Sequence, residues 1–271
     1  MVVGMAQKAR RGARAAIGLS LNLGLGLGLG GLAAGAASAA QDGARPALSC
    51  EAPADTLAAP APLPRVAAAL KKSEKLNILI IGSPIGVGRG QRKSYPAALE
   101  SLLEHALTGV DVVITNRPVS GEIAATAAER MRTEVALSRP DLLIWQVGAN
   151  DALQHVAPQD YEAHLREGVR WAKENGLDVL LVGFEANPWL HDDREADAIR
   201  EATRRVALSE NVLYLRRTSA MQFATRTRDR IEQGDQPFAA EIGYDCLAEQ
   251  VAQALVANMV LRRTRPAPIE P

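Results

Sequence analysis

Four short clusters of glycine and polar residues hold the side chains of this sequence that could do chemistry. They are Gly82-Ser83-Pro84, Ser120-Gly121-Glu122, Gly148-Ala149-Asn150-Asp151 and Asp235-Gln236-Pro237-Phe238. A serine hydroxyl attacks an acyl carbon efficiently only when a neighbouring base removes its proton. An asparagine amide or a glycine N–H can stabilise the negative oxygen that such an attack creates. These residue types therefore indicate acyl or ester chemistry, provided that the fold brings the clusters together.

Five short apolar runs precede or separate these clusters and have the composition of β-strands. They contain mostly Val, Ile and Leu without period-two alternation, and they are Leu76–Ile81, Val110–Thr115, Leu142–Val147, Val179–Val182 and Val212–Leu215. Such continuous runs are typical of strands that are covered on both faces. Amphipathic helices lie between them, and an apolar stripe through Leu247, Val251, Leu255 and Met259 marks the last helix.

The alternation of strands and helices predicts a single α/β domain. We expect a doubly wound parallel sheet of five strands in the flavodoxin-like order, with helices on both faces in a three-layer sandwich. Ligands of such sheets bind beyond the carboxyl ends of the strands. The loops that begin at Ser83, Asn116, Gly148, Gly183 and Arg216 should therefore meet at one edge.

In their spacing and strand context, the four clusters resemble the SGNH (GDSL-type) hydrolases, a family of flavodoxin-like esterases and lipases. The resemblance covers about residues 76–260. In that family a serine follows the first strand, a glycine N–H and an asparagine amide bind the oxyanion, and a final Asp-x-x-His block supplies the base and the acid that orients it. The resemblance assigns the oxyanion or ligand-binding role to Gly121 and Asn150, and the position of the acid to Asp235.

Two residues that carry out the family's chemistry are replaced in this sequence. With Gly82 on the family glycine, Pro84 occupies the position of the nucleophilic serine, and Phe238 occupies that of the histidine. Proline has neither a hydroxyl nor a backbone N–H. In another hydrolase, loss of the serine or the histidine lowers turnover about a millionfold. The resemblance thus implies a catalytically impaired binding or accessory module for a small-molecule, acyl-ester or glycan ligand, with no cofactor and no metal.

Two alternatives remain open from the sequence. The protein could be an active acyl-ester or carbohydrate-ester hydrolase that uses displaced residues. Ser83 would then act as the nucleophile, and His155 or His191, which follow the third and fourth predicted strands, would act as the base. Alternatively, the domain could be purely structural and bind no ligand, because a fold alone does not determine a function.

The first 39 residues have the pattern of a signal peptide. A basic segment from Lys8 to Arg14 precedes a glycine-laced apolar run, and Ala37-Ser38-Ala39 provides a small-residue cleavage site. We expect export to the periplasm or the medium, with no stable membrane span after cleavage; an uncleaved anchor is the alternative. An Ala- and Pro-rich leader at 40–72, an SGNH hydrolase-like domain at 73–263 and a tail at 264–271 complete the expected organisation.

The charge of the chain bears on nucleic-acid binding, and its cysteines bear on a possible disulfide. The chain has 31 basic and 31 acidic residues and no basic stripe, so the sequence argues against nucleic-acid binding. Its two cysteines, Cys50 and Cys246, could form a disulfide in an exported protein. Two separate buried thiols are the alternative.

Overall fold

The structure is a computed structural model that describes residues 57–72, 75–83, 95–184, 194–217 and 236–261, all within one compact unit, Leu48–Pro271. The strands are β1 (Leu57–Ala59), β2 (Lys75–Gly82), β3 (Asp111–Pro118), β4 (Leu142–Gln146), β5 (Asp178–Val182) and β6 (Leu213–Leu215). The helices are α1 (Pro64–Lys72), α2 (Tyr95–Ala106), α3 (Ala124–Ser138), α4 (Ala149–Leu153), α5 (Pro158–Glu174), α6 (Arg194–Glu210) and α8 (Gln236–Leu261).

The strands form one sheet in the order β1-β6-β5-β4-β2-β3. Strands β2 to β6 are mutually parallel, and their order along the sheet is the flavodoxin-like order expected from the sequence. All five predicted strands are present, with ends that differ from the predicted ends by no more than a few residues. The parallel α/β prediction is therefore confirmed.

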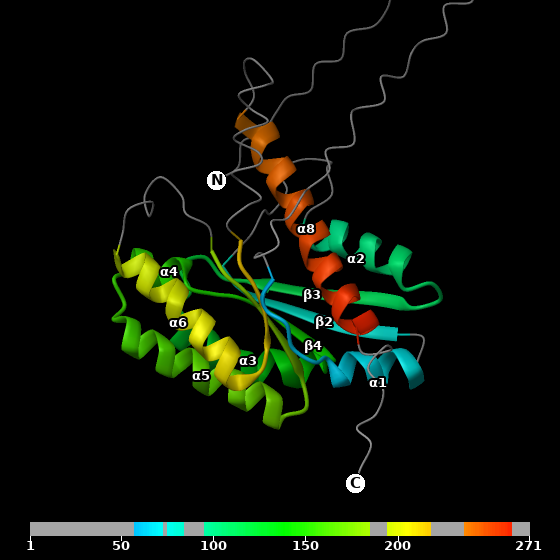
Figure 1. Ribbon diagram of the computed structural model, residues 1–271, viewed down its shortest axis with the longest axis horizontal. Helices are drawn as coiled ribbons and strands as arrows, with labels where there is room; N and C mark the ends of the chain where they lie inside the picture. Colours follow the sequence, from blue (N-terminus) through cyan, green and yellow to red (C-terminus); the bar gives the residue numbers. More distant parts are fainter. Residues whose placement is uncertain (1–56, 73–74, 84–94, 185–193, 218–235, 262–271) are drawn as a thin grey trace, which may run out of the picture. The chain divides into compact units, whose positions relative to one another are not determined.

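Helices cover both faces of this sheet (Figure 1). In β2, Leu79 and Ile81 contribute to the core under α3, α5 and α6, whereas Ile78 and Ile80 contribute to the core under α1, α2 and α8. Because successive side chains of a strand point to opposite faces, an uninterrupted apolar strand serves both cores. The same pattern explains why these strands could be recognised without period-two alternation.

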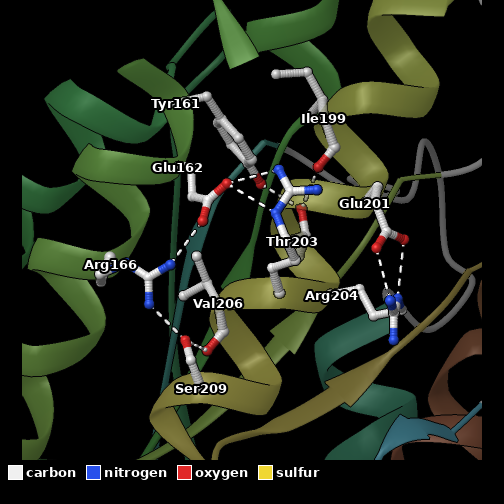
Figure 2. Close-up of polar contacts among 10 residues, drawn as sticks. Tyr161, Glu162, Arg166, Ile199, Glu201, Thr203, Arg204, Val206 and Ser209 are labelled. Atoms are coloured by element: carbon white, nitrogen blue, oxygen red, sulfur yellow. Dashed lines mark hydrogen bonds and ion pairs between the residues drawn. The ribbon is translucent and has the colours of Figure 1, made fainter. Parts of the chain in front are cut away.

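Helices α5 and α6 pack side by side through a buried polar contact that charged side chains surround (Figure 2). The hydroxyls of Tyr161 and Thr203 are 2.7 Å apart, and Thr203 donates its own proton to the carbonyl of Ile199. Tyr161 is therefore the donor to Thr203. On the surface, Glu162 forms ion pairs with Arg166 and Arg205. These contacts fix α6, which carries residues along the ligand edge of the sheet.

The expected leader at 40–72 is wrong for its second half, because residues 57–72 form β1 and α1. Strand β1 adds to β6 in the antiparallel direction and makes a sixth strand. Helix α1 begins at Pro64, a residue type that suits the first helical position. Its Val66 N–H donates to the Asp178 carboxylate at 2.9 Å, and the Val66 side chain is fully buried. The Ala- and Pro-rich composition concealed an element that docks on the sheet.

The structure also bears on the expected disulfide and on the expected lack of a membrane span. Cys246 of α8 is fully buried, and the described part of the chain contains no free cysteine. Cys50 lies outside the described residues, so its bridge to Cys246 stays a prediction, as do the cleavage site and the tail at 264–271. Within the ranges given above, no helix combines the length and apolar character that a membrane crossing requires.

Candidate functional site

Three of the four sequence clusters meet at the carboxyl edge of the sheet. Strand β2 lies between β3 and β4 and pairs with both. Ser83 directly follows β2, Gly121 lies between β3 and α3, and Asn150 lies in the first turn of α4, just beyond β4. The loops after three adjacent parallel strands are therefore neighbours, as the position of ligand sites in such folds requires.

Ser83 and Asn150 contact each other directly. The Asn150 Nδ2 group donates to the Ser83 hydroxyl oxygen at 2.8 Å. Gly82, just before Ser83, makes this contact possible, because its φ is +100° and a Cβ there would lie 2.0 Å from the carbonyl oxygen of Gln146. Only glycine combines this conformation with so close an approach to β4. The sequence cluster Gly82-Ser83 is thus explained by the packing of two strands.

The second N–H of the Asn150 amide is also used. It donates to the backbone carbonyl of Glu122 at 2.8 Å, so Asn150 connects the loops after β2, β3 and β4. The Glu122 side chain is only 3% exposed and forms a two-point ion pair with Arg130, at 2.7 Å for both contacts. Arg130 also donates to the carbonyl of Arg117. This pair anchors the loop that carries Gly121.

Gly121 is an exposed turn residue with a φ of +76°. Its carbonyl accepts a hydrogen bond of 2.7 Å from Nε2 of Gln154, at the end of α4. Within the described residues its N–H meets no acceptor. The neighbouring Glu122 carbonyl is bonded to Asn150, so the two residues assigned to the oxyanion site lie on adjoining loops. Their oxyanion role stays a prediction from the sequence resemblance.

Asp151 is a positioning residue that the sequence analysis did not single out. Its carboxylate is 2% exposed and accepts the N–H of Ala124, the first residue of α3, at 2.9 Å. Burial raises its pKa, while the backbone N–H of Ala124 acts in the opposite direction. Asp151 therefore caps α3 from its place in α4 and ties the cluster around Gly121 to the cluster around Asn150. The only sign of this role in the sequence was that Asp151 stands next to Asn150 in the third cluster.

A family model, the Non-GDSL lipase-like family, matches residues 49–261, which include every described element. The chain belongs to the Non-GDSL lipase-like family, within the SGNH/GDSL-type hydrolases. The match begins before β1, which agrees with the presence of β1 and α1 in the domain.

Relatives of this lipase-like chain include two esterases. It is 30% identical over 126 residues to an arylesterase of Vibrio mimicus, over 45% of this chain and 60% of that protein. It is 29% identical over 113 residues to esterase TesA of Pseudomonas aeruginosa, over 41% of this chain and 55% of that protein. The chain thus spans little more than half the length of these relatives.

Solved structures share the fold of this lipase-like chain. Esterase EstA from Pseudoalteromonas sp. superposes with a TM-score of 0.53 at 17% identity, over 66% of this chain and 98% of that protein. A mutant of Axe2, an acetylxylan esterase from Geobacillus stearothermophilus, superposes with a TM-score of 0.51 at 20% identity, over 68% of this chain and 94% of that protein. At these identities the likeness establishes the fold alone.

Most of the other residues that the sequence assigned to the catalytic site of this family member lie outside the described residues. Pro84, Asp235 and His191 belong to segments that the structure does not describe, and Phe238 is placed only as a residue near the start of α8. Their assignments therefore remain predictions from the sequence. The described ranges also contain no group of three or more His, Cys, Asp or Glu residues that could hold a metal ion.

His155 lies at the same edge of the sheet but is directed to another partner. It follows α4 with a φ of +53°, and its Nδ1 lies 2.8 Å from the Glu195 carboxylate at the start of α6. Both side chains are exposed. The Ser83 hydroxyl has its hydrogen bond with Asn150, and within the described residues no imidazole is bonded to it. Ser83 and His155 thus share an edge without forming a nucleophile–base pair.

Proposed function

We propose that this SGNH-type protein binds a small acyl or carbohydrate ligand at the carboxyl edge of its sheet and hydrolyses it poorly or not at all. Membership of an esterase-like family supports the ligand class. Carbohydrate ligands are included because the sequence resemblance to the SGNH hydrolases implies an acyl-ester or glycan ligand. The replaced residues Pro84 and Phe238 are the reason to expect impaired catalysis.

The observation that carries this proposal is the hydrogen bonding of Asn150. Both N–H groups of its amide have acceptors inside the protein, the Ser83 hydroxyl and the Glu122 carbonyl. An oxyanion could accept from this amide only after one of these bonds is broken. The amide is therefore arranged to hold three loops together, whereas an effective oxyanion site has donors already aimed at the reacting oxygen.

The state of Ser83 supports the same conclusion. A serine hydroxyl becomes a nucleophile when a base accepts its proton, but within the described residues no imidazole is hydrogen-bonded to Ser83, and His155 pairs with Glu195. Without that transfer, attack on an ester would have to proceed from the neutral hydroxyl. A ligand carbonyl or sugar hydroxyl can still bind at this edge, because binding needs donors and acceptors but no proton transfer.

The alternative is an active hydrolase that uses displaced residues, and one observation favours it. The Nδ1 atom of His155 is held by Glu195 at 2.8 Å, which is how an acid orients a catalytic histidine. A movement that brought the other ring nitrogen to Ser83 would complete a serine–histidine–acid arrangement. In that case Ser83 would attack the ester carbonyl, and His155 would take its proton and return it to the leaving alcohol.

Initial rates with p-nitrophenyl acetate and p-nitrophenyl butyrate test the proposal. We expect the purified full chain to match an empty-vector preparation. Turnover that disappears in both Ser83→Ala and His155→Ala, and survives in the exposed-surface control His105→Ala, would establish the displaced triad and refute the proposal. Turnover that survives both but falls in His191→Ala would instead identify that residue as a base acting on water.

We also propose that the protein is exported. The support is the basic, apolar and small-residue pattern of residues 1–39. Expression of the full chain in a bacterium, followed by fractionation and intact mass measurement, tests this directly. Protein that stays in the cytoplasm with residues 1–39 intact would refute it.

A further inference from the structure

Arg200 has a partly unbonded guanidinium group near the carboxyl edge of the sheet. It lies on α6, and its guanidinium carbon is 4.5 Å from the centre of the Phe184 ring, just after β5. This is the distance and arrangement of a cation–π contact. The Phe184 ring in turn packs against Gly148, since a Cβ at that glycine would lie 2.9 Å from the ring. Arg200 is therefore one side chain removed from the loop that carries Asn150.

The hydrogen bonding of Arg200 is incomplete on one side. Its Nη1 donates to the Asp197 carboxylate at 2.6 Å. Its Nε and Nη2 atoms are buried and, among the residues that the structure describes, have no hydrogen-bond partner. These two atoms carry three of the five N–H donors of a guanidinium group. Leaving charged donors buried without an acceptor is strongly unfavourable, so an acceptor is expected on this side.

Two other arginines of the chain show what normally fills that position. Arg204, one turn along α6, directs Nε and Nη2 at the two oxygens of Glu201, at 2.9 and 2.7 Å (Figure 2). Arg130 directs the same two atoms at the two oxygens of Glu122. The Nε–Nη2 edge matches the spacing of two oxygens on one carboxylate or phosphate group. No carboxylate of the described residues faces the same edge of Arg200.

A second donor, the Tyr214 hydroxyl, lies within electrostatic reach of Arg200. The Tyr214 hydroxyl on β6 rests over Gly183, the residue just after β5, since a Cβ at Gly183 would lie 2.8 Å from it. Burial raises the pKa of Tyr214 to about 12, while the nearby guanidinium groups of Arg216 and Arg200 act in the opposite direction. The phenol therefore keeps its proton at neutral pH and can donate it in a hydrogen bond.

We infer that the Nε–Nη2 edge of Arg200 binds an oxyanion, namely the carboxylate or phosphate group of a ligand. The Tyr214 hydroxyl is an additional donor. The ligand of this protein would then carry a negatively charged group that lies toward β5 and β6, while its neutral part lies toward Ser83 and Asn150. The inference rests on the proposed binding role for its biological meaning. The anion site itself is defined by Arg200 and does not depend on whether esters are hydrolysed.

Isothermal titration calorimetry of the full chain with sodium phosphate and sodium acetate, at constant ionic strength set with chloride, tests the inference. We expect binding on the order of millimolar for at least one anion, a range in which a single group at one site is measurable. Arg200→Gln should weaken it about tenfold or more, because the charge-assisted two-point contact is lost. The matched control Arg204→Gln, whose edge is already filled by Glu201, should stay within about twofold of the wild type.

The anion that binds more tightly identifies the charged group of the ligand. Arg200→Lys adds a check on geometry, because lysine keeps the charge but lacks the planar fork. We expect it to bind clearly more weakly than the wild type. Wild-type protein that binds neither anion, or Arg200→Gln that binds as tightly as the wild type, would overturn the inference.

A second variant covers the case in which Arg200→Gln does not fold. The Asp197 side chain is 74% exposed, so Asp197→Asn should fold normally. It removes the carboxylate that competes for the same guanidinium, and anion binding should become measurably tighter. Unchanged or weaker binding would count against the site. Because no ester enters these titrations, a failure here is separate from an unexpected finding of esterase activity.

Discussion

Asp151→Ala should destabilise the domain by removing the cap of α3. The Asp151 carboxylate is buried and accepts the N–H of Ala124 at 2.9 Å, across two loops of the candidate site. An alanine leaves that N–H buried without its acceptor. Loss of a helix cap costs about 0.5–2 kcal/mol, and an unsatisfied buried donor costs about 1–3 kcal/mol. The two ranges describe the same lost hydrogen bond and are therefore not added. We expect the free energy of unfolding to fall by about 2 kcal/mol.

Thermal unfolding followed by circular dichroism measures this loss. For a domain of this size, 1 kcal/mol corresponds to about 2–4 °C, so Asp151→Ala should lower Tm by about 4–8 °C. Asp160→Ala is the matched control, because Asp160 is an exposed aspartate in the first turn of α5. It should lower Tm by no more than about 2 °C. A Tm for Asp151→Ala equal to that of the control would refute the capping role.

Asp151→Asn separates the hydrogen bond from the charge. Asparagine keeps an oxygen that can accept from Ala124, so the loss at neutral pH should be smaller than for alanine. Burial raises the pKa of Asp151 in the folded state, so the folded protein holds this proton more tightly than the unfolded chain. The stability that this protonation provides is fully present below the unfolded pKa of about 3.9 and is lost as pH rises through the folded value. Relative to the wild type, Asp151→Asn should therefore gain stability as pH rises above about 4. A relative stability that falls over that range would contradict this assignment.

Three further predictions follow from the sequence and the packing. Pro84→Ser and Phe238→His should each change ester hydrolysis little, whereas the double variant should exceed the product of the single effects, because the members of a triad act as a unit; background rates in all four proteins would mean that the pocket no longer supports the reaction. In exported protein the two cysteines should resist alkylation until reduced, and reduction should lower stability by about 2–5 kcal/mol; free thiols before reduction would exclude the bridge. Gly148→Ala should lower Tm more than Gly109→Ala, because both have positive φ but only Gly148 would bring a Cβ within 2.9 Å of a packed ring; equal losses would show that backbone strain alone matters.

The elements of this fold that could be predicted are those determined by nearby residues. The five parallel strands are continuous apolar runs, and the stripe of Leu247, Val251 and Leu255 on α8 is buried as its spacing predicts. The rule that ligand loops meet at the carboxyl ends of parallel strands predicted that the loops beginning at Ser83 and Gly148 share one edge, and the structure shows Ser83 in contact with Asn150 there. In each case the signal is contained within one element or one simple topology.

The features that were missed depend on partners far away in the sequence. Helix α1 receives a hydrogen-bond acceptor from Asp178, and α3 receives its cap from Asp151, whereas a reading of local sequence searches for a cap just before the helix. Arg200 also resembled an ordinary helix-surface arginine with Asp197 three residues earlier. Its unfilled side becomes visible only when the fold places Phe184 against it.

The pairing of β1 with β6 determines when the sheet can be completed. Among the described residues the first strand pairs with the last, so this ladder can close only when the chain is available as far as Leu215. Closing so long a loop is entropically costly and slows folding relative to local contacts. Until β1 arrives, β6 presents an open edge to which another chain could add. Once paired, β1 is itself the edge strand on this side, and its three residues offer another chain little backbone to pair with.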